Sequence, residues 1–221
     1  METLKKRRAR AKAVFEILDP LYTPKKTALQ YRTPFQLLVA TILSAQCTDV
    51  RVNQVTKALF NKHKTPKDFL EVPISELEND IRSTGFFKNK AKSIKGCAQA
   101  LVGFHGGELP STMEEMVKLP GVGRKTANVV LGAVFDIPGV VVDTHVKRLS
   151  NRLRFTENQD PDKIEKDIQG LLPKERWRRF SDILVYHGRE VCKARKPDHG
   201  RCPVYKHCPE GKRWKAARPP Q

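Results

Sequence analysis

The stretch Leu119-Pro-Gly-Val-Gly-Arg-Lys125 joins two segments that both have helical patterns. Pro120 cannot continue the first helix, because its ring fixes φ and its nitrogen carries no hydrogen. Gly121 and Gly123 permit positive φ and leave room for close backbone approach. The N–H groups that begin the second helix then point outward, with the positive end of the helix dipole behind them. The stretch therefore predicts an anion site that fits a DNA phosphate and reads no base.

The composition favours a polyanionic partner. The 221 residues include 42 Lys and Arg against 24 Asp and Glu, a formal net charge of +18. Such an excess favours nucleic acid or an anionic membrane face, although an inert basic surface would look the same. No apolar run approaches the roughly 20 residues of a membrane helix, and the N-terminus lacks the apolar core of a signal peptide. We expect no membrane partner and a cytoplasmic, nucleoid-associated protein.

Helical patterns dominate the rest of the chain and predict an all-α fold. Thr33-Pro34 is typical of a helix start, and the apolar run Phe35–Ala45 predicts a buried helix. A stripe that includes Val50 and Val52 predicts the next one. Only Gly139–Val142 has a weak strand pattern.

The five cysteines fall into two groups. Cys47 and Cys97 lie in apolar helical segments and are most simply core thiols. Cys192, Cys202 and Cys208 crowd into the last thirty residues. An odd count without a secretory signal argues against a disulfide framework and favours an intracellular thiol or metal role.

Two residues near the hairpin could carry chemistry. Lys125 lies just inside the second helix, and Asp143 follows eighteen residues later in Val141-Val-Asp-Thr-His-Val146. A hairpin alone is a weak signal, because many such turns bind nothing. Asp143 could also simply cap a helix that begins at Thr144.

Four motifs together resemble those of the endonuclease III family. The members of this family are bifunctional DNA glycosylases of the helix–hairpin–helix superfamily. They are Leu119–Ala127, Val142-Asp-Thr-His145, Leu43-Ser-Ala-Gln-Cys-Thr-Asp49 and His187-Gly-Arg189. The similarity runs from about Lys6 to Cys208. The resemblance implies a helix–hairpin–helix DNA glycosylase fold with two helical lobes and a DNA cleft between them. We expect a central lobe at 27–137 with the hairpin, and a second lobe at 1–26 and 138–221 with a metal loop and a basic tail.

The resemblance also implies the roles of individual residues. Lys125 would be the amine nucleophile of a glycosylase and AP lyase, and Asp143 the carboxylate beside the reacting sugar. The amine must be neutral to attack, and we expect partial burial and nearby positive charge to favour that form. Gln46 would fill the gap left by the flipped base, and Phe86 would be a wedge, unless it packs in the core. The implied DNA-binding set is Gly121, Val122, Gly123, Arg124, Gln46, Phe86, His145, Lys193, Arg195 and Lys196.

The C-terminal motif departs from the family pattern of four cysteines. Here the order is Cys192-x6-His199-x2-Cys202-x5-Cys208, so a histidine stands at the second ligand position. The resemblance implies a [4Fe–4S] cluster with three Cys ligands and His199. A [3Fe–4S] cluster and a Cys3His zinc site remain open, because zinc accepts this ligand set readily.

The expected substrate is double-stranded DNA that carries an oxidised pyrimidine or an abasic site, bound by a monomer in a bacterium or an archaeon. Two other functions stay open. The chain could be a monofunctional glycosylase in which Lys125 only contacts phosphate, or a non-catalytic helix–hairpin–helix DNA-binding protein.

Overall fold

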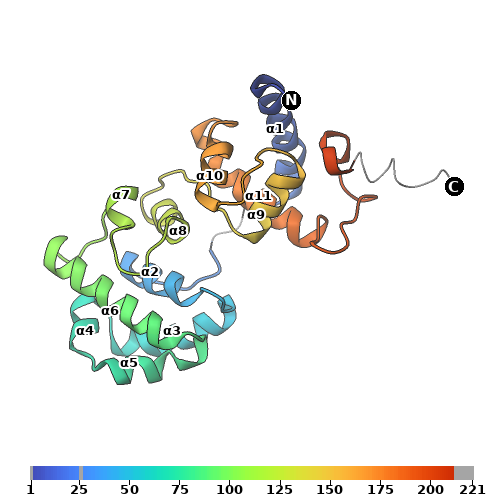
Figure 1. Cartoon of the computed structure of the whole chain (residues 1–221). Coiled ribbons are helices and arrows are strands. Elements are labelled where there is room, and N and C mark those ends of the chain that lie inside the picture. The colour runs from blue at the N-terminus through green and yellow to red at the C-terminus, as the bar shows by residue number, and fades with distance from the viewer. Residues whose placement is uncertain (1, 25–26, 212–221) are drawn as a thin grey trace. The chain divides into compact units, whose positions relative to one another are not determined.

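All regular elements of the described chain are helices, as the sequence predicts (Figure 1). The structure is a computed structural model that describes residues 2–24 and 27–211, so the basic tail from residue 212 lies outside it. The strand pattern at Gly139–Val142 was misleading, because that segment pairs with no strand among the described residues. The Val141 N–H donates instead to the Ser181 hydroxyl at 3.1 Å. None of the described helices combines the length and the hydrophobicity that crossing a bilayer requires.

The chain forms two compact units, Lys25–Ile137 and Met1–Pro24 together with Pro138–Gln221. Each unit has its own hydrophobic core. The use of these units as two lobes around DNA stays a prediction.

The unit Lys25–Ile137 is built around α2, whose residues Phe35–Leu43 are all buried. Thr33 caps this helix by accepting from the Gln36 N–H, which confirms the predicted start. The next helix buries Val52 but leaves Val50 69% exposed, so Val50 does not belong to the apolar stripe. The elements are α2 (Pro34–Leu43), α3 (Asp49–Lys62), α4 (Pro66–Glu71), α5 (Ile74–Asp80), η2 (Arg82–Thr84), α6 (Phe87–Phe104), α7 (Met113–Met116) and α8 (Arg124–Val134).

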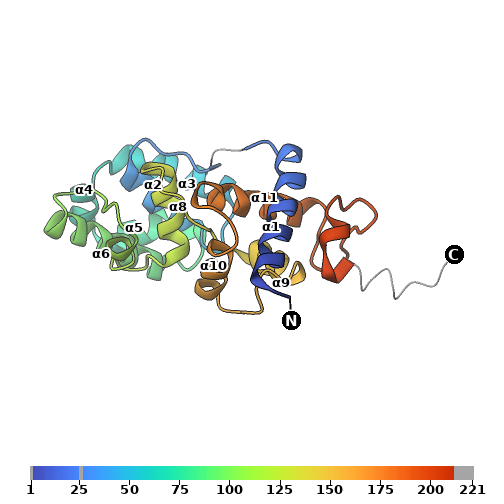
Figure 2. The same ribbon diagram turned by 90° about the horizontal axis from the view of Figure 1, so that it is seen from above.

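The other unit joins the two ends of the chain. Helix α1 packs beside α11, and the rings of Phe15 and Phe180 lie 6.2 Å apart (Figure 2). The Arg179 guanidinium also donates to the Asp19 carboxylate at 2.5 Å. The elements are α1 (Leu4–Leu18), η1 (Asp19–Leu21), α9 (Thr144–Arg152), α10 (Pro161–Gln169), η3 (Lys174–Arg176), α11 (Trp177–Glu190) and η4 (Tyr205–His207).

Candidate functional site

The hairpin before α8 packs tightly on α6. Gly121 has φ +75°, and a Cβ added there would lie 2.3 Å from the Ser93 hydroxyl oxygen. A Cβ at Gly96 would lie 2.9 Å from the Pro120 ring. The Cys97 thiol is fully buried, as predicted, and donates to the Pro120 carbonyl at 3.1 Å. Both close approaches therefore need glycine, and they hold the turn in one position.

One N–H of the turn bonds within the turn itself, whereas the start of α8 has no side-chain cap. Val122 is buried and its N–H donates to the Leu119 carbonyl at 3.0 Å. Val122 therefore anchors the turn, which argues against the expected DNA contact through its side chain or N–H. Gly123 precedes α8 and provides no side-chain cap. The start of α8 is thus suited to an external anion.

Alanine substitutions at the two hairpin glycines should differ in their effects. Gly121→Ala should lower the free energy of unfolding by about 1–3 kcal/mol, because the alanine would have to adopt positive φ and its Cβ would overlap the Ser93 side chain. Gly123→Ala should cost less than about 1 kcal/mol, because its φ is −87° and no atom lies within 4 Å of the added Cβ. Urea unfolding of both variants measures the difference. Equal losses would show that the Ser93 contact does not constrain the turn.

Lys125 is exposed, in the first turn of α8. The expectation of partial burial is therefore wrong for the described chain. Its amine lies beside the N-terminus of α8 and follows Arg124 in sequence.

Asp143 caps α9, as the simpler interpretation of the sequence predicts. Its Oδ1 accepts from the N–H groups of His145 and Val146, both at 2.8 Å. The side chain is half-buried, and Oδ2 accepts no hydrogen bond from the described residues. The cap fixes the carboxylate through one oxygen and leaves the second for other partners.

His145 belongs to a network that joins α9 to the end of α11. Arg148 Nη2 donates to the carbonyls of Gly188 and Cys192, at 2.9 and 3.1 Å, and lies 3.2 Å from His145 Nδ1. A Cβ at Gly188 would lie 3.0 Å from His145 Nδ1. This close approach explains why glycine follows His187.

Gln46 and Phe86 both project from the unit Lys25–Ile137. They have positive φ, +55° and +49°, and both are exposed, Phe86 by 63%. Phe87, in contrast, is partly buried against the core. The exposure of Phe86 therefore rules out the alternative that it packs in the core.

The four candidate metal ligands, Cys192, His199, Cys202 and Cys208, line one small cavity. Each thiol also has an N–H donor near its sulfur. Arg152 Nη1 lies 3.2 Å from Cys192 Sγ, and the Gly211 N–H donates to Cys208 Sγ at 3.4 Å. His187 Nε2 lies 3.5 Å from Cys202 Sγ.

His187 is held in a defined form by its surroundings. Burial lowers the pKa of His187 to about 4, so the ring is neutral at pH 7. The Tyr22 hydroxyl lies 3.0 Å from Nδ1 and can donate to it, which leaves the Nε2 hydrogen for Cys202. N–H donors of this kind stabilise thiolates, so the three cysteines suit a metal group.

The four residues offer three thiols and one imidazole on the wall of one cavity. Thiolates are the usual ligands of iron–sulfur clusters, and histidine replaces cysteine in some of them, so this donor set fits such a cluster.

Lys193, Arg195 and Lys196 are exposed on the loop inside this motif. Arg152 holds the loop by donating to the carbonyls of Lys193 and Ala194, at 2.8 and 2.7 Å. The sequence contains no signal for this role of Arg152. The basic side chains are thus presented outward from a fixed backbone.

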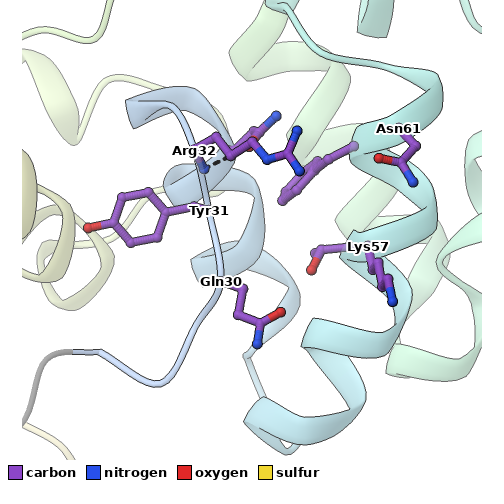
Figure 3. Close-up of a pocket in the computed structure, with 8 residues that line it drawn as sticks. Gln30, Tyr31, Arg32, Lys57 and Asn61 are labelled. Carbon is purple, nitrogen blue, oxygen red and sulfur yellow. Dashed lines mark hydrogen bonds between the residues drawn. The ribbon is translucent and has the colours of Figure 1, made fainter.

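A separate polar cavity of about 210 Å³ lies between the segment before α2 and helix α3 (Figure 3). Arg32 and Lys57 contribute two cations, and Tyr31 points away from Lys57 and Asn61. None of the predicted site residues lines this cavity, and its wall contains no carboxylate. This cavity therefore shares no residue with the predicted site.

Comparison with known proteins agrees with these features. Residues 39–174 match the family model described as HhH-GPD superfamily base excision DNA repair protein, and residues 192–208 match the iron–sulfur binding domain of endonuclease III. Endonuclease III of Synechocystis sp. is 52% identical over 92% of this chain and 93% of its own length. The Bacillus subtilis endonuclease III is 47% identical, over 89% and 90%.

The chain belongs to the endonuclease III family. A non-covalent endonuclease III–DNA complex superposes with a TM-score of 0.85 at 41% identity, over 98% of this chain and all of that one. A trapped endonuclease III–DNA covalent intermediate gives 0.84 at 42% identity, over 97% and 100%. The chain is accordingly a DNA-binding base excision repair enzyme, a glycosylase with AP lyase activity, and it carries an iron–sulfur binding domain.

Proposed function

We propose that the enzyme removes oxidised pyrimidines, such as thymine glycol, from double-stranded DNA and cleaves the strand through a Schiff base on Lys125. The observation that carries the proposal is the placement of an exposed amine in the first turn of α8, directly after a hairpin that α6 holds in place. Phosphate binding at Gly121, Gly123 and Arg124 would bring the sugar to this amine.

The chemistry needs the amine, a carboxylate and water. The Lys125 amine attacks C1′ and forms the C–N bond, while the bond from C1′ to the damaged base breaks and the base leaves. Ring opening gives an imine, which acidifies the proton on C2′. Loss of this proton breaks the C3′–O bond by β-elimination, and water then hydrolyses the imine and frees the lysine.

Asp143 would act at two points. Its negative charge stabilises the positive charge that develops on the sugar when the base leaves. It can also accept a proton from the lysine before attack. The α9 cap supports both roles, because it orients the carboxylate through Oδ1 alone.

The remaining predicted residues would open and hold the duplex. Gln46 would fill the space left by the flipped base, and Phe86 would wedge between base pairs. His145, Lys193, Arg195 and Lys196 would contact the backbone of the DNA.

Borohydride trapping on a panel of duplexes tests the proposal. Borohydride reduces the imine to a stable bond, so the protein should be trapped on duplexes with thymine glycol or an abasic site, but not on undamaged DNA. A released base without a trapped complex would indicate a monofunctional glycosylase. Salt-sensitive binding without any product would indicate a non-catalytic DNA-binding protein.

We further propose that Cys192, His199, Cys202 and Cys208 hold a [4Fe–4S] cluster. The shared cavity and the three N–H donors to sulfur support this assignment. When bound, the cluster supplies a rigid cross-link between the end of α11 and the basic loop. Imidazole in place of a thiolate makes the cluster more positive and raises its reduction potential.

Iron content and a single substitution test the ligand set. Protein purified without oxygen should be coloured and contain about four irons per chain. His199→Cys should keep the iron and lower the reduction potential, because the added thiolate carries a negative charge. A colourless protein that binds zinc, or three irons that His199→Cys leaves unchanged, would contradict the assignment.

We place the enzyme in the cytoplasm of a bacterium and propose that it acts as a monomer. The organisms of the relatives support the first statement.

A further inference from the structure

Lys90, in the first turns of α6, is buried with only 5% of its surface exposed. Its ammonium donates to the Leu43 carbonyl at 2.9 Å and to the Thr84 carbonyl at 2.8 Å. The structure pairs it with no carboxylate among the described residues. Burial accordingly lowers the pKa of Lys90. A buried ammonium is costly unless its hydrogens are satisfied, so this lysine is an unusual choice for a helix that otherwise packs with apolar residues.

The two acceptors belong to segments that are far apart in sequence. Leu43 is the last residue of α2, three positions before Gln46, and Thr84 ends η2, two positions before Phe86. The Lys90 N–H also donates to the Phe86 carbonyl at 3.1 Å. Lys90 therefore bonds directly to Phe86, and its ammonium links the segment that carries Phe86 to the segment that carries Gln46.

Both segments need such support. Gln46 and Phe86 adopt the left-handed backbone region, which non-glycine residues occupy only when the surroundings hold them there. Both side chains are exposed, so their own packing does not fix them. Two projecting side chains act on one DNA site only if the spacing of their backbones is fixed.

We infer that Lys90 is a positioning residue, which sets the spacing of the Gln46 and Phe86 segments so that both side chains enter the duplex together. The inference rests on the proposed roles of Gln46 and Phe86. It predicts that removing the ammonium weakens base extrusion more than it weakens binding to phosphate, because the hairpin at Gly121 does not depend on these hydrogen bonds.

The test is Lys90→Met on duplex DNA with 2-aminopurine opposite a tetrahydrofuran abasic analogue. The analogue cannot form an imine, so the fluorescence of 2-aminopurine reports only the unstacking of the opposite base. At saturating protein, the fluorescence rise with Lys90→Met should be less than half that of the parent. The affinity should change less than about threefold, and the glycosylase kcat on thymine glycol should fall about 10- to 100-fold.

Lys95→Met is the matched control. Lys95 lies on the same helix, and its ammonium also donates to two carbonyls, those of Leu70 and Val72 at the end of α4. It thus makes similar bonds away from the two DNA-facing segments. Lys95→Met should give the same rise in 2-aminopurine fluorescence as the parent, even if it lowers the midpoint of thermal unfolding. The reason is that the folded protein still extrudes the base.

Lys90→Gln is a second variant, because its amide keeps hydrogen-bond donors and should fold if Lys90→Met does not. Its fluorescence rise should lie between that of Lys90→Met and that of the parent. If Lys90→Met does not fold, the rise with Lys90→Gln should still be smaller than that of the parent. The inference is overturned if every folded Lys90 variant has the parent amplitude, or if Lys95→Met loses as much. A parent protein that gives no fluorescence rise also overturns it, yet leaves borohydride trapping, and with it the proposed chemistry, intact.

Discussion

Lys125→Gln should abolish borohydride trapping on abasic duplex DNA and lower strand cleavage at least about 1,000-fold. Glutamine has nearly the length of lysine, but its amide nitrogen is not nucleophilic and forms no imine. Because Lys125 is exposed, the free energy of unfolding should change by less than about 0.5 kcal/mol. The affinity for an abasic analogue should change only a few-fold, since the hairpin contacts remain.

The control is Lys118→Gln, which removes the same charge just before the hairpin. Lys118 is exposed and forms an ion pair with Glu115 on the surface. This variant should keep trapping and cleavage near the parent level. If Lys125→Gln is still trapped at the parent rate, another amine is the nucleophile. If both variants lose activity equally, the effect comes from net charge and not from imine formation.

Asp143→Asn should separate the cap from the chemistry, with base release about 100-fold slower and little loss of stability. Asparagine is as good an N-cap as aspartate, so the bonds from the His145 and Val146 N–H groups should remain. The negative charge is lost, and with it the stabilisation of the sugar. Asp143→Ala should be slow as well, and should also lower the free energy of unfolding by about 1 kcal/mol.

Asp160 provides the matched control for the cap. It caps α10 by accepting from the Lys163 N–H at 3.0 Å, in the same unit. Asp160→Asn should change neither activity nor stability, and Asp160→Ala should cost about as much stability as Asp143→Ala without slowing base release. Single-turnover release of thymine glycol, with thermal unfolding of each variant, gives both quantities. Full activity in Asp143→Asn would reduce Asp143 to a helix cap.

Local patterns were enough to predict much of this molecule. The Thr33-Pro34 start, the burial of Phe35–Leu43 and the need for glycine at position 121 depend on neighbours in sequence, and the structure confirms them. The predicted buried run extended too far, because α2 ends at Leu43 and Ala45 is exposed. Gly123 has φ −87° and no close neighbour, so its backbone does not require glycine. The orientation of Phe86 could not be predicted, because it depends on a single left-handed residue that no pattern marks. Burial of Val122 and exposure of Val50 were missed for a related reason: both follow from packing against other helices.

Residues that act through long-range contacts gave no signal at all. A lysine on a helix usually faces water, so nothing in the sequence marks Lys90 as buried between two carbonyls. Arg152 likewise looks like one more basic surface residue, although it donates to the backbone of the cysteine loop. Each role requires at least one partner more than forty residues away, and only the fold brings such partners together.

The pairing of α1 with α11 has a consequence for the order in which the chain can fold during synthesis. The unit Lys25–Ile137 is continuous and can close once its last residue leaves the ribosome. Helix α1 is made first, yet its apolar face must wait for residues near Phe180. At about 5–20 residues per second, the wait is on the order of 10–30 s. The first helix translated is thus among the last to be buried.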